Sequence, residues 1–367
     1  MLPYVLLILI PGLLSYIAVD KNKIYIGTTQ RVQHRNLTLP VFFIIFYFML
    51  ACRAPSIGND TSNYIYYFDR YRQVAFWAVP DLDVELFYGY FNWLIGAVTN
   101  NAQIFLALAA LVSLYPIAWL YSKNRQHSFL MMVLFVNLPI FIMLFSGIRQ
   151  CMAIAIGVYA YHFVCRKKPI AFVLTVIAAM QFHRSAFILL PMYPLYYMNF
   201  KRKHLFVILP VIAAVYTLNN RIFSVIGMLM SGFLNEYSFE ITETNAYSML
   251  ILFFIFLLFS YIIPGKNNLD RETMGLRNLL IMVVILQCFV PLHSLAMRLN
   301  YYYLVFVPLA ISKVIQNAAE KHKQIAKISV WTMSVFFAAY FFIGIYQGAL
   351  NGTGKLNTVP YIPFWSA

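Results

Sequence analysis

Long runs of apolar residues, separated by short polar intervals, make up most of this 367-residue chain. A backbone surrounded by hydrocarbon must satisfy its own hydrogen bonds, so continuous apolar runs predict α-helices that cross a membrane. The chain contains about twelve such runs. They are Leu2–Val19, Leu39–Cys52, Ile104–Tyr121, Phe129–Phe145, Cys151–Cys165, Ile170–Phe182, Ala186–Met198, Leu205–Leu218, Tyr247–Ile263, Leu279–Leu292, Tyr301–Ile315 and Ile325–Tyr346. The pattern predicts an all-α, polytopic integral membrane protein in which residues 1–367 form a single membrane domain.

Several of these runs are short for a membrane span. A run of about 13 to 15 residues gives a helix of about 20 to 23 Å, whereas the hydrocarbon core is about 30 Å thick. Either flanking residues extend the helices, or the polar intervals around Arg149 and His183 lie in a water-filled cavity. We favour an outward-facing cavity. The apolar segment near residues 86–99 contains Tyr88, Tyr90, Asn92 and Trp93 and is therefore expected to be a re-entrant or interfacial helix.

Composition supports the membrane interpretation. Hydrophobic residues make up 62% of the chain and charged residues only 11%, far fewer than the roughly 25% of a typical soluble domain. The net charge of +15 comes from short basic clusters between apolar runs, which argues against nucleic acid as a partner. The four cysteines lie in or beside apolar runs without a CxxC motif, which favours small buried side chains over a metal site.

The distribution of lysine and arginine predicts the orientation. Most of the 27 basic residues fall in alternate intervals, near residues 21–35, 123–125, 166–168, 201–203, 266–277 and 313–327. Intervals rich in these residues stay in the cytoplasm, so the remaining intervals should face outward. This alternation requires the segment near 86–99 to enter and leave by the outer side. No carboxylate lies in the middle of an apolar run, which argues against a proton-coupled transporter.

Residues 53–72, RAPSIGNDTSNYIYYFDRYR, form the most polar and aromatic stretch. Asp60 and Thr61 are typical of a helix start, and aromatic residues beginning with Tyr64 then recur at helical spacing. This pattern predicts a short amphipathic helix along the outer surface. Asp60 is either a helix cap or a carboxylate of a site, in which case the tyrosines offer a platform for sugar rings.

Two polar breaks between apolar runs carry candidate chemistry. Arg149, in FSGIRQCMA, would cost about 2.5 to 3.5 kcal/mol at membrane depth, so it needs a counter-ion or a function. Asp60 is one candidate partner, and the alternative is an anion site, since guanidinium binds phosphate through two parallel hydrogen bonds. In QFHRSAF, His183 beside Arg184 is either a structural residue or a general base for a hydroxyl proton.

Two further features are less specific. Arg298, in HSLAMRLNYYY, either anchors a helix end at the interface or joins the other outward arginines around a diphosphate. Asp81-Leu82-Asp83 matches a DxD metal motif, but such a short pattern also arises by chance, and Glu85 suggests a generally acidic loop. The sequence contains no nucleotide-binding motif of the GxxxxGK or GxGxxG type.

Several segments together resemble the EpsG family of exopolysaccharide polymerases, which are similar in role to Wzy-type O-antigen polymerases. These segments are GNDTSNYIYYFDRYR, SGIRQCMAIAI, QFHRSAFILLP and a late arginine followed by tyrosines. The family pattern falls here on Asp60, Thr61 and Tyr64, on Arg149 and Gln150, and on His183 and Ser185. Arg184 stands where the family commonly has proline.

The resemblance implies transfer of a growing glycan from undecaprenyl diphosphate to a lipid-linked repeat unit, on the outer face of a bacterial inner membrane. We interpret His183 as the base, Asp60 as the alternative base, and Arg149 as a diphosphate ligand. The expected substrate-binding residues are Arg298, Arg184, Arg53, Thr61, Tyr64 and Tyr302. We expect a metal-independent enzyme without a cofactor. Besides membrane lipid and the lipid-linked oligosaccharide, a chain-length regulator is one candidate partner.

Two other functions remain open at this point. The chain could be a flippase or another transporter of lipid-linked oligosaccharides, although transport needs groups reachable from both sides and the candidate residues all face outward. It could also be a membrane acyltransferase, since such enzymes also use histidine.

Overall fold

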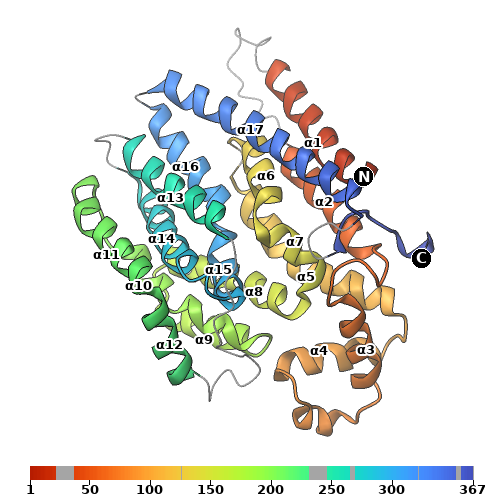
Figure 1. The fold of residues 1–367 in the computed structure, drawn as a ribbon. Helices are drawn as coiled ribbons and strands as arrows, with labels where there is room; N and C mark the ends of the chain where they lie inside the picture. The colour runs from red at the N-terminus through yellow and green to blue at the C-terminus, as the bar shows by residue number, and fades with distance from the viewer. Residues whose placement is uncertain are drawn as a thin grey trace. The chain divides into compact units, whose positions relative to one another are not determined.

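The computed structural model describes residues 1–21, 37–124, 126–230, 246–264, 269–320, 322–352 and 357–366 (Figure 1). These residues form helices and no strand, as the apolar pattern predicted. The α-helices are α1 Leu2–Lys21, α2 Thr38–Ala51, α3 Thr61–Tyr71, α4 Leu86–Gly96, α5 Ala102–Ser122, α6 Ser128–Asn137, α7 Pro139–Ser146, α8 Ile148–Cys165, α9 Pro169–Met180, α10 Met192–Tyr197, α11 Leu205–Thr217, α12 Asn219–Met230, α13 Tyr247–Ile262, α14 Arg271–Gln287, α15 Ser294–Leu304, α16 Val307–Ala319 and α17 Lys323–Leu350. The 3-10 helices are η1 Phe76–Asp81, η2 Arg184–Leu189, η3 Arg202–His204 and η5 Phe364–Ser366.

Almost every predicted run corresponds to a helix or to a bent pair of helices. The exception is Ala186–Met198, for which the prediction of one span is wrong. This segment forms η2 and the six-residue helix α10 instead. Pro191 precedes α10 and Pro194 lies within it. Because proline lacks a backbone N–H and disfavours helical backbone in the residue before it, the two prolines prevent one continuous helix.

The chain divides into two compact units. The first unit comprises Met1–Val158, Gln181–His183 and Val330–Ala367, and the second comprises Tyr159–Met180 and Arg184–Ser329. Two helices, α8 and α17, begin in one unit and end in the other. The single membrane domain inferred from the sequence stays a prediction.

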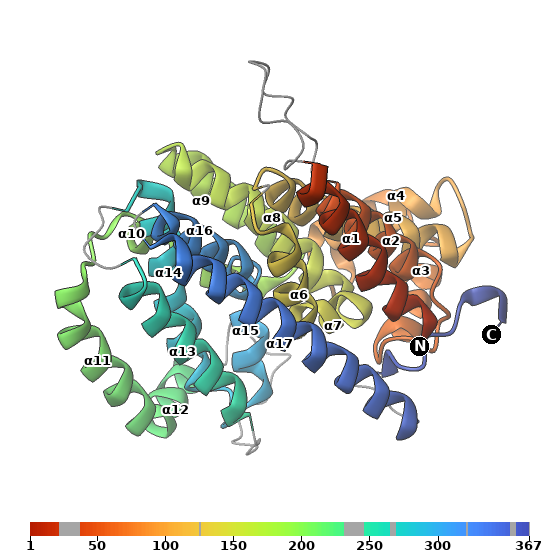
Figure 2. The ribbon, with the colours of Figure 1, turned by 90° about the horizontal axis from the view of Figure 1, so that it is seen from above.

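Three of the described helices, α5, α8 and α17, are long and apolar enough to cross a membrane. The bent pairs α6 with α7 (64°), α11 with α12 (73°) and α15 with α16 (45°) raise the number to six if each pair is one span. Figure 2 shows the corner between α11 and α12. The chain is therefore a helical membrane protein, whereas the twelve crossings and the outward cavity stay predictions.

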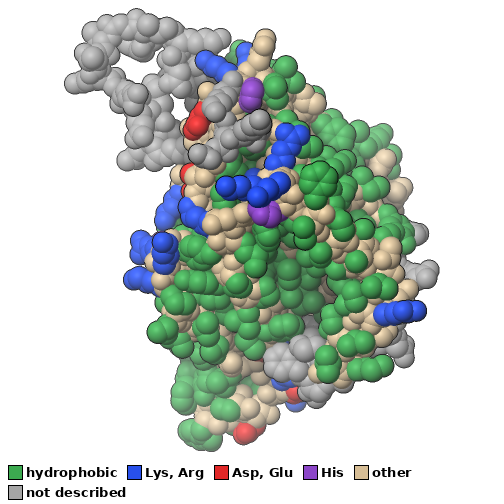
Figure 3. Space-filling model, turned by 90° about the vertical axis from the view of Figure 1, so that its left-hand side faces the viewer, with side chains coloured by type: hydrophobic (Ala, Val, Ile, Leu, Met, Phe, Trp, Pro, Cys, Tyr) green, Lys and Arg blue, Asp and Glu red, His purple; other side chains and the backbone are tan. Residues whose placement is uncertain are grey.

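The molecular surface agrees with this class of protein. Hydrophobic side chains cover most of the face shown in Figure 3, and lysine and arginine side chains are most numerous in its upper left part. Several charged residues that the orientation argument used lie outside the described residues. They are Lys23, Arg31, Arg35, Arg125, Lys266 and Lys321.

An aromatic core holds the first unit together. Rings from α2, α5, α6 and α7 pack against one another, and the rings of Phe46 and Phe141 stack with centroids 4.7 Å apart. In this unit α1 and α2 lie side by side (Figures 1 and 2). Leu138 adopts an extended backbone before Pro139, which separates α6 from α7. This bend places the end of α7, at Ser146, beside the polar stretch 53–72.

The C-terminal segment fixes the beginning of that stretch from the other side. The amide of Phe364 donates to the carbonyl of Cys52 (2.9 Å), and the amide of Ala54 donates to that of Ile362 (2.9 Å). The hydroxyl of Tyr361 donates to the carbonyl of Met49 (3.0 Å). The loop between α2 and α3 is therefore held by the C-terminal segment of the chain.

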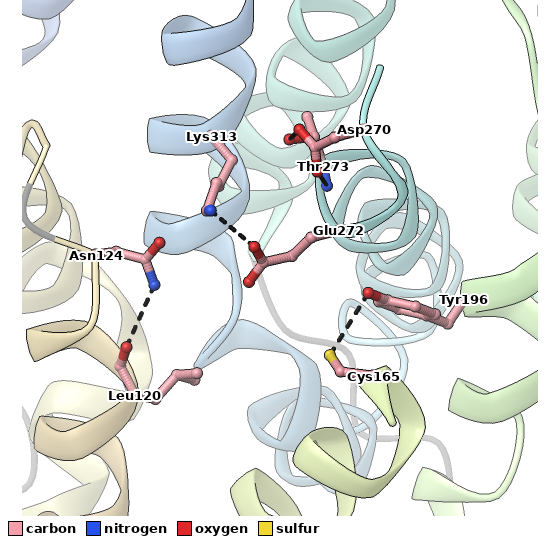
Figure 4. A network of polar contacts seen from close by, with 8 residues as sticks. All are labelled: Leu120, Asn124, Cys165, Tyr196, Asp270, Glu272, Thr273 and Lys313. Atoms are coloured by element: carbon pink, nitrogen blue, oxygen red, sulfur yellow. Dashed lines mark hydrogen bonds and ion pairs between the residues drawn. The ribbon is translucent and has the colours of Figure 1, made fainter. Parts of the chain in front are cut away.

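The second unit packs around α14, which contacts α10, α11, α13, α15 and α16. Polar contacts fix the start of this helix (Figure 4). Asp270 accepts a hydrogen bond from the amide of Thr273 (2.9 Å) and so caps α14. Glu272 pairs with Lys313 of α16, with Nζ and Oε2 2.7 Å apart. These contacts attach α14 to α16 at one end of the unit.

Candidate active site

The helix predicted in the polar stretch exists as α3, which begins at Thr61 directly after Asp60. Asp60 is the N-cap residue, but its carboxylate does not bond to the helix amides. The carboxylate accepts a hydrogen bond from the hydroxyl of Ser146 instead (3.0 Å). The backbone amide of Asp60 donates to the hydroxyl oxygen of Ser146 (3.2 Å). Asp60 therefore ties the start of α3 to the end of α7.

Thr61 strengthens this connection. Its side chain is fully buried, and the hydroxyl donates to the carbonyl of Ile57 (2.6 Å) while lying 3.1 Å from that of Phe145. Sequence reasoning placed Thr61 among the substrate-binding residues. The contacts in the structure are those of a residue that positions α3.

Arg149 lies in the first turn of α8, directly after the break at Gly147 that separates this helix from α7. The amide groups at a helix N-terminus carry a partial positive charge, so a cation there is unfavourable unless an anion lies nearby. The chain supplies that anion from a segment about sixty residues earlier.

Glu85 is the carboxylate that joins the site together. It is the N-cap residue of α4, and one of its oxygens, Oε2, lies 2.9 Å from Nη1 of Arg149. The other oxygen, Oε1, lies 3.1 Å from Nδ1 of His183. An ionised carboxylate can only accept, so Nδ1 carries the proton and donates it to Glu85. One carboxylate therefore bridges two of the residues that the sequence singled out.

Backbone hydrogen bonds hold His183 against α4. The amides of Phe87 and Tyr88 both donate to the carbonyl of Gln181, over 3.0 and 3.3 Å. The ring of Phe87 also packs against Phe182, with centroids 6.0 Å apart. The position of the His183 ring is thus fixed by the same helix start that carries Glu85.

The charges around Glu85 determine its protonation. Burial alone would raise its pKa, but the hydrogen bond from His183 and the positive charge of Arg149 lower the pKa to about 2. Glu85 is therefore ionised at neutral pH. It neutralises Arg149 and keeps the proton of His183 on Nδ1, which leaves Nε2 as the nitrogen with acceptor character.

Two tyrosines form the aromatic side of the site. Tyr64 of α3 and Tyr88 of α4 pack edge to face with ring centroids 6.1 Å apart. The guanidinium carbon of Arg149 lies 5.9 Å from the centre of the Tyr88 ring, within cation–π range. Burial raises the pKa of Tyr64 to about 12 although the charge of Arg149 opposes this rise, and burial also raises the pKa of Tyr88. Both phenols therefore stay protonated at neutral pH.

The three polar residues differ in access to solvent. The side chain of Arg149 is 25% exposed, whereas those of Glu85 and His183 are only 3% and 6% exposed. An anion that approaches the site would therefore meet Arg149 first. The arrangement suits binding of a phosphate group by Arg149, with His183 held behind it in a fixed orientation.

Sequence reasoning missed Glu85, which it treated as part of an acidic loop, and suggested Asp60 as the partner of Arg149. The structure corrects this suggestion, because Glu85 is the residue paired with Arg149 and Asp60 is bonded to Ser146. One signal could have identified Glu85. It stands directly before the apolar segment that forms α4, where a carboxylate in a hydrophobic setting needs a charged partner.

Other predicted site residues lie in the second unit. Helix α15, which carries Arg298 and Tyr302, packs against η2, which begins at Arg184. The hydroxyl of Tyr302 lies 3.0 Å from that of Ser185, and both residues are buried. Arg298 is exposed. Whether Arg184, Arg298 and Tyr302 act on the same ligand as Arg149 stays a prediction.

Arg53, a further predicted substrate-binding residue, is only 1% exposed. Its guanidinium donates to the carbonyl of Leu50, and its backbone pairs with Pro363. Burial lowers the pKa of Arg53 to about 10. Arg53 thus takes part in the packing of the C-terminal segment on the loop after α2, and its binding of substrate stays a prediction.

The DxD pattern gives no metal site in the described residues. Asp81, the last residue of η1, and Asp83, in the loop before α4, are both exposed. No group of three or more His, Cys, Asp or Glu side chains within the described ranges could hold a metal ion. Metal-independent chemistry stays a prediction.

The fold and the site define a class of protein: a helical membrane protein that fixes an arginine and a histidine on one buried carboxylate. The chain belongs to the EpsG family, whose model matches residues 36–362. No protein of curated function and no solved structure matches the chain. Membership of this family is consistent with a polysaccharide polymerase.

Proposed function

We propose that the protein is a glycan polymerase of the membrane. It would transfer a growing glycan from undecaprenyl diphosphate to a lipid-linked repeat unit on the extracytoplasmic face of the inner membrane. The observation that carries this proposal is the bridge from Glu85 to Arg149 and His183 in a chain of the EpsG family. The bridge joins a group that binds phosphate to a group that takes a proton.

The reaction needs both groups. A hydroxyl of the acceptor sugar attacks the anomeric carbon of the donor glycan, and a new carbon–oxygen bond forms there. The bond between that carbon and the diphosphate oxygen breaks, and undecaprenyl diphosphate leaves with the electron pair. The hydroxyl proton passes to Nε2 of His183, whose Nδ1–H is held by Glu85.

Arg149 would stabilise the leaving group. Negative charge increases on the diphosphate oxygens as the bond breaks, and a fixed guanidinium lowers the energy of that charge most when water is scarce. Nη1 is held by Glu85, so the cation is oriented before substrate arrives. Glu85 neutralises Arg149 in the empty site, and the diphosphate adds its charge on the exposed side of the guanidinium.

Further parts of the proposal come from the sequence. Arg184 and Arg298 would add positive charge around the same diphosphate, and Arg184 directly follows His183 in the chain. The expected partners are the lipid-linked oligosaccharide, membrane lipid and a chain-length regulator. The basic intervals support an outward site, and the absence of a nucleotide motif suits a donor that is already activated as a diphosphate.

Purified protein in lipid nanodiscs, supplied with undecaprenyl-diphosphate-linked repeat units, tests the proposal. We expect a ladder of products that differ by one repeat unit. His183→Ala should lower kcat by about 10²-fold or more, the usual contribution of a general base. Arg72→Ala is a matched control, since Arg72 pairs with Asp69 on the surface of α3 and lies outside the site.

Each alternative function predicts a different result in this assay. Folded protein that leaves the repeat units unjoined would contradict the polymerase proposal. Transfer of unjoined units across the bilayer would identify a flippase instead, and an acyl group on the glycan, seen as a mass increase, would identify an acyltransferase.

A further inference from the structure

Helix α4 carries an apolar strip that no described residue covers completely. Phe87, Phe91, Leu94 and Val98 recur at helical spacing along α4 and the turn that follows it, so they share one side. The exposed fractions are 42% for Phe87, 62% for Leu94 and 85% for Val98, and Phe91 is half-buried. We call these four residues the α4 strip.

The other sides of α4 are occupied. Tyr88, Asn92 and Ile95 are buried and face the core shared with α3. A second side is covered by Phe76 of η1, whose ring packs on Tyr90 and Trp93 at 5.1 and 5.0 Å. The strip lies between these two sides and all of its residues are apolar. The ring of Phe91 also packs on Phe105 of α5, with centroids 6.2 Å apart, whereas Phe87, Leu94 and Val98 remain exposed.

The strip begins at the candidate active site. Phe87 lies two residues after Glu85 and packs on Phe182, which directly precedes His183. Its amide donates to the carbonyl of Gln181. An apolar ligand on the strip would therefore have one end at Phe87, whose ring packs on the residue before His183.

The other end of the strip leads to a membrane span. Val98 lies four residues before α5, one of the three helices long enough to cross the membrane. Ile104, Leu108 and Leu111 are exposed on α5 and also recur at helical spacing. Exposed apolar side chains therefore lie on both α4 and α5, on either side of the polar residues 99–101.

We propose that the α4 strip binds the isoprenoid chain of the diphosphate-linked substrate. This inference rests on the proposed polymerase function and adds a binding site for the lipid part of the substrate. A diphosphate held by Arg149 must carry its apolar chain toward the bilayer, and the strip is an exposed apolar surface that begins two residues from Glu85, the partner of Arg149. The eleven residues of α4 give a strip of about 16 Å, enough for the first few isoprene units.

The choice of an isoprenoid over bulk phospholipid follows from position. A surface that only faces bulk lipid needs no connection to a charged site, whereas the α4 strip begins two residues from Glu85. Its aromatic end, Phe87 and Phe91, lies nearest the site, and flat rings suit the planar double bonds of an isoprenoid chain.

Photo-crosslinking to undecaprenyl diphosphate tests the proposal without requiring catalysis. The variant Leu94→benzoylphenylalanine, reconstituted in nanodiscs, is irradiated with radiolabelled undecaprenyl diphosphate. We expect a crosslink that saturates and falls at least fivefold when unlabelled undecaprenyl diphosphate is added in excess. The matched control is Ile44→benzoylphenylalanine on α2, where Ile44 is 55% exposed but far in sequence from the site.

The control should give a crosslink that increases linearly with the label and is not competed. Equal, non-saturating crosslinks at both positions would show that bulk lipid covers the strip and would overturn the proposal. Because the probe carries no glycan, a chain that binds it but makes no polymer would contradict the polymerase function while leaving the strip intact.

A kinetic measurement distinguishes a role of the α4 strip in lipid binding from a role in the fold. Leu94→Gln and Val98→Gln should raise KM for the undecaprenyl-linked substrate several-fold and leave kcat unchanged. With a substrate on a two-isoprene chain, too short to reach Leu94, the variants should match the wild type. Ile44→Gln serves as the control. An equal loss with both substrates would show that the substitutions disturb the fold and would overturn the proposal.

Discussion

The candidate site depends on the carboxylate of Glu85, which contacts both Arg149 and His183. Glu85 neutralises Arg149 at the start of α8 and accepts the Nδ1 proton of His183, and its side chain is almost fully buried. Removing one partner of a buried ion pair usually costs about 3 to 5 kcal/mol because the other charge is left uncompensated. Substitutions of Arg149 are therefore best tested by their effect on the reaction rate, and substitutions of Glu85 by their effect on stability.

Arg149 should not be replaceable by lysine. Arg149→Lys can still pair with Glu85, but its ammonium group lacks the planar fork that holds a second anion. We expect kcat/KM for polymerisation to fall at least tenfold in Arg149→Lys and further in Arg149→Ala. Arg72→Lys, directly after the end of α3, should leave the rate unchanged. Full activity of Arg149→Lys would remove the argument for two parallel hydrogen bonds to the diphosphate.

Glu85 should make stability depend on pH. Its pKa falls from 4.5 to about 2 on folding, so the native state binds fewer protons than the unfolded state between these values. The stabilisation is complete above about pH 4.5 and is lost as the pH falls toward about 2. Glu85→Gln should lower the free energy of unfolding at neutral pH by roughly 3 kcal/mol and so lower Tm. It should also remove the part of the stability that depends on acid pH.

The measurement is thermal unfolding in detergent across this pH range. Glu272→Gln provides the comparison, because its pair with Lys313 is more exposed and should contribute less than about 1 kcal/mol. A wild-type curve that does not change relative to Glu85→Gln between pH 5 and pH 3 would contradict the depressed pKa.

At the scale of helices, the local sequence pattern predicted where most helices lie and where α3 begins. The apolar runs located nearly all helices, and Asp60 and Thr61 located the start of α3. The failure at Ala186–Met198 had a local cause as well, since Pro191 and Pro194 were visible in the sequence. Hydropathy alone could not show that this run consists of two short helices.

The junction between α3 and α7 should require glycine at position 58. Gly58 has φ of +87°, and a Cβ there would lie 2.1 Å from the backbone oxygen of Phe145. Gly58→Ala should destabilise the protein by roughly 1 to 3 kcal/mol and displace α3. Gly344→Ala in α17 is the control, because nothing lies within 4 Å of its added Cβ and alanine favours the helix. Equal Tm values for both variants would contradict this role.

At the scale of the whole molecule, the site arises from contacts that no local pattern contains. Glu85, Arg149 and His183 come from three distant segments, and the sequence identified Arg149 and His183 because each interrupts an apolar run. Glu85 interrupts none, since it ends a polar loop already rich in acids. Its role depends on the hydrogen bonds between α4 and Gln181, which only the folded chain brings together.

The orientation of the site in the membrane depends on α4. With eleven residues, α4 measures about 16 Å and is too short to cross a hydrocarbon core of about 30 Å. The chain should therefore stay on the outer side from Arg53 until α5 crosses inward. Alkaline phosphatase fused after Gln73 should be active, and fluorescent protein fused after Asn124 should fluoresce in the cytoplasm. Phosphatase activity after Asn124 would mean that α4 crosses, and the basic intervals would then no longer support a site on the outer face.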